Sequence, residues 1–213
     1  MFFPAARTTK HLRFAFALGF IAIAAGWLAA RDDEHAAAGV RVQPPRPLAD
    51  FQLVDGDNQP FTRTRLQGRW SLLFFGYTHC PDVCPITMTE LAKLTPLLQH
   101  AKDAPARALQ IVFISVDPAR DTPALLKNFA GYFNEHFIAA TGPVDQLTTL
   151  TNSLGARHRR LTEQGTDYRV EHSADVWLID PQARLYAKFP VPQHAQEIAQ
   201  SVINAVQSNA GSS

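Results

Sequence analysis

Two runs of mostly apolar residues, at positions 70–75 and 110–116, constrain the fold of this chain more than any other feature. Each run has the length of a strand and lacks the alternation of polar and apolar residues that a half-exposed strand shows. Each therefore predicts a strand buried on both faces. Strands of this kind lie inside sheets that helices cover on both sides. The chain is expected to fold around such a sheet.

The segments around these runs alternate between strand and helix signals. A turn at residues 55–58 predicts an opening hairpin, and Gly155 is expected to end a helix. Asp121 or Thr122 is expected to cap another helix, with Pro123 in its first turn. This order predicts an α/β protein with a central mixed sheet flanked by helices, the layout of a thioredoxin-like fold. The remaining predicted strands are 51–54, 137–140, 176–179 and 185–189, and the predicted helices are 85–98, 122–133, 143–154 and 195–206.

The N-terminal segment has the charge pattern of a membrane anchor. Three basic residues precede an uncharged apolar run at residues 14–30, and acidic residues follow it. This pattern predicts a cytoplasmic N-terminus, residues 1–13, and one transmembrane helix, residues 14–30. The alternative is a signal peptide cleaved near Ala29 or Ala37. In both cases the folded domain is expected outside the cytoplasm, on the periplasmic side of a bacterial inner membrane.

Composition and charge indicate how the rest of the chain is organised. Residues 31–47 contain charges, alanines and prolines, which predicts a linker that lifts the domain off the membrane without packing on it. The folded domain is expected at residues 48–207, followed by a flexible tail of small polar residues at 208–213. The formal net charge of +1 gives no electrostatic basis for binding nucleic acid.

The chain contains only two cysteines, Cys80 and Cys84. A crosslink across so short a loop adds little stability, so these residues are not a structural disulfide framework. They directly follow the predicted strand at 70–75 and start a predicted helix, and sites in α/β sheets form at such positions. Unpaired N–H groups at a helix start stabilise thiolate, which attacks disulfides and binds metals. A redox dithiol, a pair of metal ligands, and two inert thiols or an incidental disulfide all remain open.

The spacing of the cysteines suits a metal ion. Residues i and i+4 of a helix lie on one face, with β-carbons about 5–6 Å apart. Two metal–sulfur bonds of about 2.3 Å place the sulfurs about 4 Å apart, which this spacing allows, although it also allows a disulfide. Among eight histidines, His172 lies just before the strand at 176–179, and we expect it at the cysteine end of the sheet. Two sulfurs and one imidazole suit copper and zinc alike. An ordinary core or surface histidine is the alternative for His172, and His79 is a weaker candidate ligand.

Three motifs occur in the chain in this order: FFGYTHCPDVCP at 74–85, SVDPARDTP at 115–123 and YRVEHSADVWLIDP at 168–181. Together they resemble the motifs of the Sco/SenC family of copper-binding assembly proteins. The resemblance extends over about residues 48–206 and implies a thioredoxin-like fold. It also implies that Cys80, Cys84 and His172 bind one copper ion per chain, as Cu(I) or Cu(II).

The same resemblance implies a function and partners. The family delivers copper to, or prepares the thiols of, the dinuclear copper centre of cytochrome c oxidase. The implied partners are the oxidase subunit that holds this centre, a thiol reductant and a copper donor protein, and the implied role is that of a metallochaperone rather than an enzyme. Trp177 and the Ala183-Arg184 pair depart from the family pattern without involving an expected ligand. The second motif adds residues that are expected to be structural or to dock a partner: Asp117, Arg120 and Asp121.

Two other functions compete with copper delivery. A membrane-anchored thiol–disulfide oxidoreductase would use Cys80 and Cys84 as its redox-active pair. A peroxidase-like activity has only the fold in its favour. Thioredoxin-like reductases place a cis-proline before the strand that faces the cysteines, whereas this chain has Ser173, Ala174 and Asp175 there. The sequence therefore favours a copper protein over a general disulfide reductase.

Overall fold

The computed structural model describes residues 39–161 and 168–210. The chain divides into two compact units, Met1–Ala38 and Gly39–Ser213, and every described residue belongs to the second. The predicted cytoplasmic segment and membrane anchor, residues 1–30, lie outside the described residues. No helix of the described part has both the length and the hydrophobicity that a membrane span requires.

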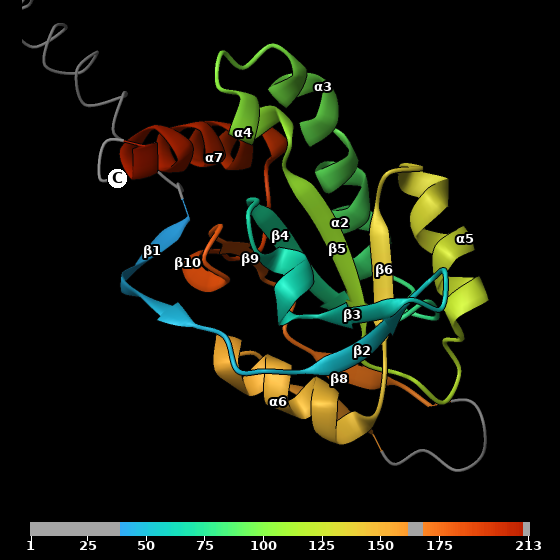
Figure 1. Ribbon diagram of the computed structural model, residues 1–213. Coiled ribbons are helices and arrows are strands. Elements are labelled where there is room, and N and C mark those ends of the chain that lie inside the picture. Colours follow the sequence, from blue (N-terminus) through green and yellow to red (C-terminus); the bar gives the residue numbers. More distant parts are fainter. Residues whose placement is uncertain (1–38, 162–167, 211–213) are drawn as a thin grey trace, which may run out of the picture. The chain divides into compact units, whose positions relative to one another are not determined.

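Within the described residues, an eight-stranded mixed sheet forms the centre of the domain (Figure 1). Strands β4, β5 and β6 run parallel to one another, and β9 is antiparallel to β4. Every residue of β4 and β5 is buried, which confirms the two strands expected from the apolar runs. The sheet has the order β1-β10-β9-β4-β5-β6-β2-β3, with the bounds β1 Val40–Pro47, β2 Gln52–Asp55, β3 Pro60–Thr62, β4 Ser71–Gly76, β5 Gln110–Ser115, β6 Ile138–Thr141, β9 Val176–Ile179 and β10 Arg184–Phe189.

Helices cover both faces of the sheet because successive side chains of a strand point to opposite faces. Leu72 and Phe74 of β4 belong to a core with α2, α3, α5 and α7, whereas Leu73 and Phe75 belong to a second core with α6. In Figure 1, α6 lies below the sheet, and α3 and α7 lie above it. The arrangement confirms the predicted mixed sheet flanked by helices. The helices are η1 Arg63–Leu66, α2 Val83–Ala92, α3 Leu94–Gln99, α4 Ala104–Arg107, α5 Pro123–Phe133, α6 Val144–Leu154 and α7 Ala195–Ala210.

The prediction of a non-packing linker at residues 31–47 is wrong for its second half, because residues 40–47 form β1 and pair with β10. Prolines indicate a linker in the sequence, but a strand at a sheet edge has a neighbour on one side only and tolerates them. Strand β1 is such an edge strand, and its register shifts between Arg41 and Arg46, across the two prolines that lie between them.

Two predicted helices differ from the structure at their ends. The helix expected at 85–98 is divided into α2 and α3 at Lys93. Helix α7 continues to Ala210, so the expected tail at 208–213 is partly helical, and its last three residues lie outside the described part. The predicted start of α5 is confirmed, since Thr122 is its N-cap and accepts a hydrogen bond from the Leu125 N–H at 3.3 Å.

Candidate metal centre

Both cysteines lie at the carboxyl end of β4. This strand ends at Gly76 and α2 begins at Val83, so the loop between them carries Cys80 and the first turn of α2 carries Cys84. The Cys80 N–H donates to the Tyr77 carbonyl at 3.1 Å, which closes a turn and holds Cys80 near the helix start. Cys84 is fully buried, Cys80 is partly exposed, and both are free thiols.

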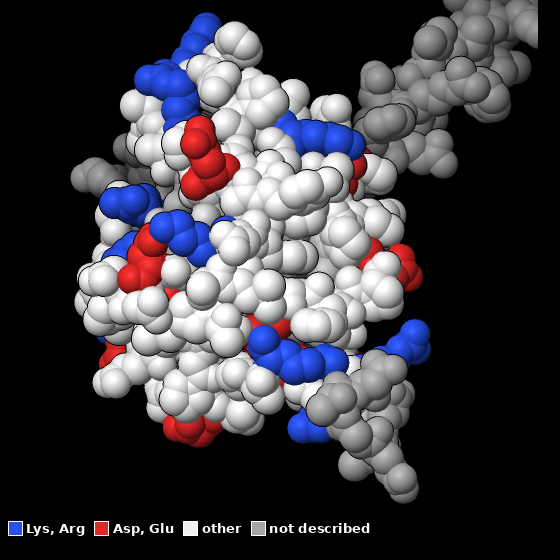
Figure 2. Space-filling model, turned by 90° about the vertical axis from the view of Figure 1, so that its right-hand side faces the viewer, with Lys and Arg blue, Asp and Glu red and all other residues white. Residues whose placement is uncertain are grey.

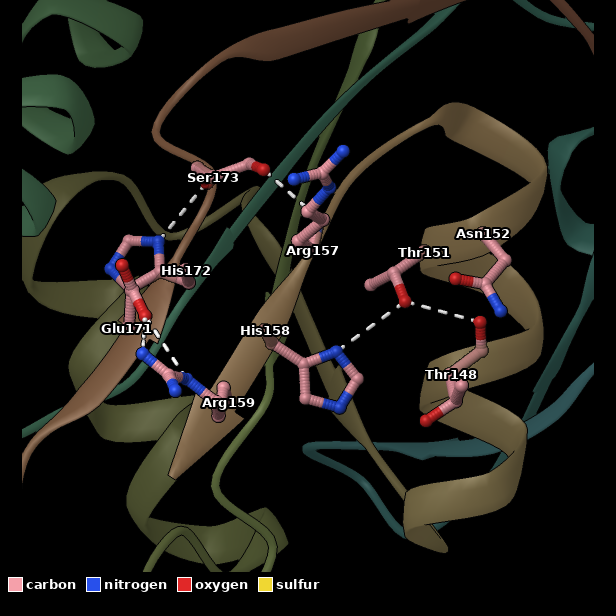
Figure 3. A pocket seen from close by; sticks show the side chains of 9 residues that line it. All are labelled: Thr148, Thr151, Asn152, Arg157, His158, Arg159, Glu171, His172 and Ser173. Atoms are coloured by element: carbon pink, nitrogen blue, oxygen red, sulfur yellow. Dashed lines mark hydrogen bonds and ion pairs between the residues drawn. The ribbon is translucent and has the colours of Figure 1, made fainter. Parts of the chain in front are cut away.

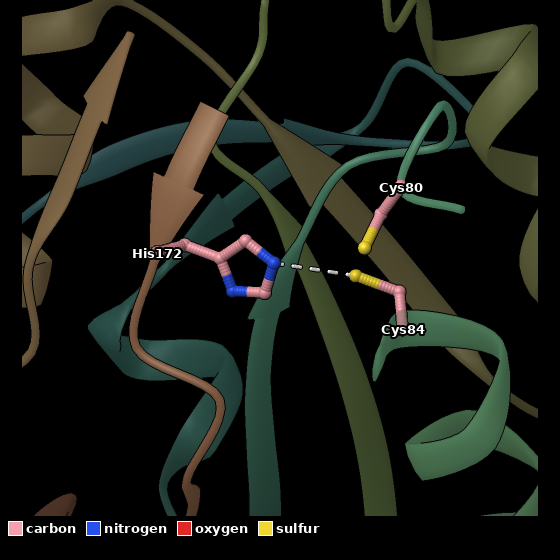
Figure 4. Close-up of side chains that lie close together, drawn as sticks. All are labelled: Cys80, Cys84 and His172. Atoms are coloured by element: carbon pink, nitrogen blue, oxygen red, sulfur yellow. Dashed lines mark hydrogen bonds between the residues drawn. The ribbon is translucent and has the colours of Figure 1, made fainter. Parts of the chain in front are cut away.

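His172 reaches the cysteines from a second, small sheet. It ends β8 (Val170–His172), which pairs with β7 (His158–Arg160) in a two-stranded ribbon that the sequence did not predict. The Nε2 atom of His172 lies 3.4 Å from the Sγ atom of Cys84. The ligand atoms of Cys80, Cys84 and His172 all lie within 4.8 Å of one another (Figure 4). The structure thus brings together the three residues predicted as ligands.

The His172 imidazole is oriented for metal binding through Nε2. Its Nδ1 lies 3.0 Å from the Ser173 carbonyl oxygen, and Nδ1 must be the donor because a carbonyl oxygen only accepts. Nε2 is then the unprotonated nitrogen of the neutral ring, and it faces the sulfurs, as in metal-binding histidines whose other nitrogen is held by the protein. The rings of Tyr77 and Phe74 meet the imidazole edge-on, with centroids 5.8 and 6.3 Å away, and restrict its rotation.

The pKa values of the two cysteines are shifted in opposite directions. A hydrogen bond with Cys84 lowers the pKa of Cys80 to about 3, while burial opposes it. The bond between the two cysteines, together with burial, raises the pKa of Cys84. The metal-free site therefore holds a thiolate at Cys80 and a thiol at Cys84. Metal binding through both sulfurs releases the proton of Cys84.

We expect iodoacetamide to modify Cys80 and to spare Cys84 in the reduced, metal-free chain at about pH 6. A thiol with an ordinary pKa of about 8.5 is almost fully protonated at this pH, but the lowered pKa of Cys80 keeps this residue ionised, and the thiolate is the reactive form. Peptide mass mapping after a timed reaction identifies the modified residue. Earlier labelling of Cys84, or labelling of Cys80 that grows about tenfold per pH unit as for an ordinary thiol, would contradict this assignment.

Gly76 makes room for the buried sulfur. A Cβ atom at this position would lie 2.7 Å from Cys84 Sγ and 2.7 Å from the ring of Phe113. Any larger residue at the end of β4 would therefore displace the sulfur or the aromatic ring of the neighbouring strand. The first sequence motif contains this glycine, but only the structure shows why it is needed.

A buried carboxylate ties the cysteine loop to the sheet. Asp121 is fully buried and accepts hydrogen bonds from the Thr78 N–H at 2.9 Å, the Thr78 hydroxyl at 2.6 Å and the Ser115 hydroxyl at 2.5 Å. Thr78 belongs to the loop that carries Cys80, so Asp121 fixes this loop against the end of β5. The predicted alternative of Asp121 as a helix cap is wrong, since Thr122 is the N-cap of α5.

A second acidic residue holds the segment that leads to His172. Asp117 accepts a hydrogen bond from the Tyr168 hydroxyl at 2.6 Å and forms an ion pair with Arg120 at 2.5 Å. The Arg120 guanidinium also lies over the Tyr168 ring, 3.7 Å from its centroid. Asp117 and Arg120 are therefore structural, which is one of the two roles expected for them. The contact with Tyr168 joins elements far apart in the sequence, so no local pattern could have revealed it.

The donor set fits a soft metal ion. Two thiolates and a neutral imidazole suit copper and zinc, and ligands of one ion lie about 4 Å apart. Mutual distances of up to 4.8 Å leave only a small contraction to reach that spacing. His79, the weaker candidate, is not part of the set, and its Nδ1 lies within hydrogen-bond distance of the Thr78 hydroxyl, at 3.0 Å.

Fold and site together define a thioredoxin-like α/β protein with a two-cysteine, one-histidine metal-binding geometry at the carboxyl end of its central strands. A family model described as SCO1/SenC matches residues 41–207, which is most of the chain. The chain belongs to the SCO1/SenC family.

Individual relatives agree with this assignment. A protein of Stutzerimonas stutzeri that is named for copper binding is 41% identical over 147 residues, which cover 69% of this chain and 71% of that protein. Bradyrhizobium japonicum ScoI, whose structure has copper bound, is 31% identical with a TM-score of 0.65, over 74% of this chain and 98% of that one. BsSco, a member of the Sco family of cytochrome c oxidase assembly proteins in which a disulfide switch was identified, shares the fold. It is 20% identical with a TM-score of 0.61, over 79% and 96% of the two chains.

Proposed function

We propose that this chain binds one copper ion through Cys80, Cys84 and His172 and serves the assembly of cytochrome c oxidase. It would deliver copper to the dinuclear copper centre of the oxidase or prepare the thiols of that centre. The observation that carries the proposal is the convergence of two sulfurs and one imidazole nitrogen within 4.8 Å of one another. The copper bound to B. japonicum ScoI and the role of the Sco family in oxidase assembly support it. Copper is the cargo of such a protein, and the partly exposed Cys80 suits release as well as binding.

A deletion strain tests this role. Cells that lack the chain are expected to assemble an oxidase with little copper in its dinuclear centre when copper is scarce. The wild-type gene should restore the copper content, and a Cys80→Ser, Cys84→Ser double variant produced at the same level should not. Full copper occupancy of the oxidase in the deletion strain would contradict the proposed role.

The ionised, partly exposed thiolate of Cys80 favours a second candidate role, the reduction of a disulfide in the partner. Cys80 would attack one sulfur of that disulfide and release the other as a thiolate. Cys84 would then attack Cys80, which leaves a Cys80–Cys84 disulfide here and two thiols in the partner. A dithiol reductant protein would have to reduce this chain again after each cycle.

The His172→Ala variant separates the two roles. We expect it to weaken Cu(II) binding more than Cu(I) binding, because two thiolates can hold Cu(I) whereas Cu(II) prefers nitrogen and more ligands. Reduction of a disulfide needs only the two cysteines, so the variant should still reduce a disulfide substrate. Spectroscopic titration with each copper ion and a disulfide-reduction assay measure the two activities. Undiminished Cu(II) binding would exclude His172 as the third ligand.

We further propose that residues 14–30 anchor the chain in the bacterial inner membrane, with the domain on the periplasmic side. The charge step across this run supports the orientation. A reporter that is active only outside the cytoplasm, fused after Ser213, should be active and remain with the membrane fraction. A soluble mature form that starts near residue 30 or 38 would show a cleaved signal peptide instead.

A further inference from the structure

A cavity of about 620 Å³ lies beside His172, between α6 and the β7–β8 ribbon. Figure 3 shows α6 on one side of it and the ribbon on the other, with the His158 ring pointing toward α6. Ligand sites in proteins commonly have volumes of about 300–1,000 Å³. The cavity is thus large enough to receive several side-chain groups of a bound molecule.

One positive charge at this cavity is uncompensated. Arg159 and Glu171, which are opposite each other in the ribbon, form an ion pair at 2.8 Å and neutralise each other. The Arg157 side chain is exposed, and its guanidinium has neither an ion pair nor a hydrogen bond within the described residues. The lining therefore attracts an anion.

A carboxylate is the anion that this lining suits best. A guanidinium binds both oxygens of a carboxylate through two parallel N–H···O bonds, which gives direction as well as affinity. The side-chain amide of Asn152, exposed on the α6 wall, offers a further donor. The hydroxyls of Thr148 and Thr151 already donate to backbone carbonyls of α6, at 2.7 and 3.1 Å, and the Thr151 oxygen also lies 3.4 Å from His158 Nδ1, so neither hydroxyl is a free donor.

Ser173 connects the cavity to the metal centre. Its carbonyl accepts the Nδ1–H of His172, while its hydroxyl oxygen accepts the Arg157 backbone N–H at 3.0 Å and its own N–H donates to the Arg157 carbonyl at 2.9 Å. Arg157 is thus hydrogen-bonded to Ser173, which directly follows His172 in the sequence. An anion held by Arg157 therefore lies close to His172. A molecule anchored there lies next to the metal ligand.

Among the described residues, the face shown in Figure 2 has no extended charged patch that could replace Arg157 in attracting a charged partner. Lys and Arg side chains lie beside Asp and Glu side chains there, and a broad uncharged surface separates these groups. An extended patch of one sign, which would steer a charged partner from a distance, is not visible on that face.

We infer that the cavity between α6 and the β7–β8 ribbon binds a glutamate or aspartate side chain on a loop of the protein that exchanges copper with this chain. This inference rests on the proposed function, since it assigns the docking point of that partner. The cavity exceeds the size of a lone carboxylate, so the residues beside the acidic one enter it as well. The acid thereby fixes the partner's loop at the strand that carries His172.

The test is an NMR titration of the full-length chain with the blocked peptide acetyl-Gly-Gly-Glu-Gly-Gly-amide, alongside the same peptide with Gln in place of Glu, and acetate. We expect the Glu peptide to shift the signals of Asn152 and Arg157, and to bind at least about tenfold more tightly than the Gln peptide and acetate. Arg157→Gln should weaken binding of the Glu peptide by about tenfold or more. Arg69→Gln, which alters an exposed arginine just before β4, at the opposite end of this strand from the cysteines, should leave it unchanged.

Copper content is measured on the same samples. Wild type, Arg157→Gln and Arg69→Gln should bind equal amounts of copper, so a chain that binds none would refute the proposed function independently of the peptide result. The docking inference is overturned if Arg157→Gln binds the Glu peptide as wild type does, or if the Gln peptide binds equally well. Acetate binding as tight as peptide binding would reveal a site for small anions instead. Loss of copper in Arg157→Gln would show that the cavity is part of the metal centre and not a separate docking point.

Discussion

Replacing Cys84 by serine is expected to abolish tight copper binding. The Cys84 sulfur is fully buried and lies 3.4 Å from His172 Nε2, so it is central to the three-residue group. A hydroxyl is a poor ligand for a soft metal ion. Loss of a residue that merely orients a metal ligand costs roughly 10–100-fold in affinity, so loss of the sulfur itself should cost more than about 100-fold. Competition with a chromophoric copper chelator measures this change on the full-length chain.

Controls separate a lost ligand from a lost fold. Serine is close to cysteine in size, so the circular dichroism spectrum and the cooperative unfolding transition should be retained. Cys80→Ser should lose copper in the same way, although Cys80 is partly exposed. A folded Cys84→Ser variant whose copper affinity stays within about tenfold of wild type would contradict the assignment of this sulfur.

The second large effect is expected on stability, from Asp121→Ala. This substitution leaves three donors without their acceptor: the Thr78 N–H, the Thr78 hydroxyl and the Ser115 hydroxyl. The Thr78 hydroxyl can still turn to His79 Nδ1, 3.0 Å away, so two donors lose their partner. A buried donor without a partner costs about 1–3 kcal/mol, so the free energy of unfolding should fall by about 2 kcal/mol or more. Urea denaturation of the copper-free, reduced chain measures it. Copper affinity should fall too, because the loop that carries Cys80 loses its anchor.

Asp50→Ala is the matched control for this substitution. The Asp50 side chain is 87% exposed and forms a surface ion pair with Arg63 at 2.7 Å. Exposed pairs contribute about 0–1 kcal/mol, so this variant should unfold almost as wild type does. If Asp121→Ala were no more destabilised than Asp50→Ala, the buried carboxylate would not be what fixes the cysteine loop.

The parts of the fold that the sequence predicts are those with strong local patterns. Strands β4 and β5 are buried on both faces, so their apolar runs identify them without knowledge of their neighbours. The start of α5 follows from Thr122 and Pro123, because capping depends on adjacent residues. The β7–β8 ribbon has no such pattern, since β7 consists of His158, Arg159 and Arg160 and is stabilised by pairing rather than by burial of an apolar face.

The metal centre, too, has one part that local sequence patterns predict and another that depends on long-range contacts. The cysteine pair follows from the sequence because its spacing and its place after a buried strand are local features. The position of His172 depends on the pairing of β8 with β7 and on a separation of 88 residues from Cys84, which no local pattern determines. Its place before the strand at 176–179 made His172 the leading candidate among eight histidines, the family resemblance strengthened this choice, and the structure then supplied the distances. The anchoring of the cysteine loop by Asp121 is likewise a long-range contact.

Copper titration of the full-length chain before and after oxidation tests the central claim most directly. The same two sulfurs can form a disulfide or hold a metal ion but not both, because metal binding requires free thiolates. The copper-free chain is oxidised, the Cys80–Cys84 disulfide is verified by mass, and copper binding is compared with that of the reduced chain. We predict one tightly bound copper ion per reduced chain, a large loss of affinity on oxidation, and recovery on reduction. Equal copper affinity of the disulfide and dithiol forms would show that these cysteines are not the ligands.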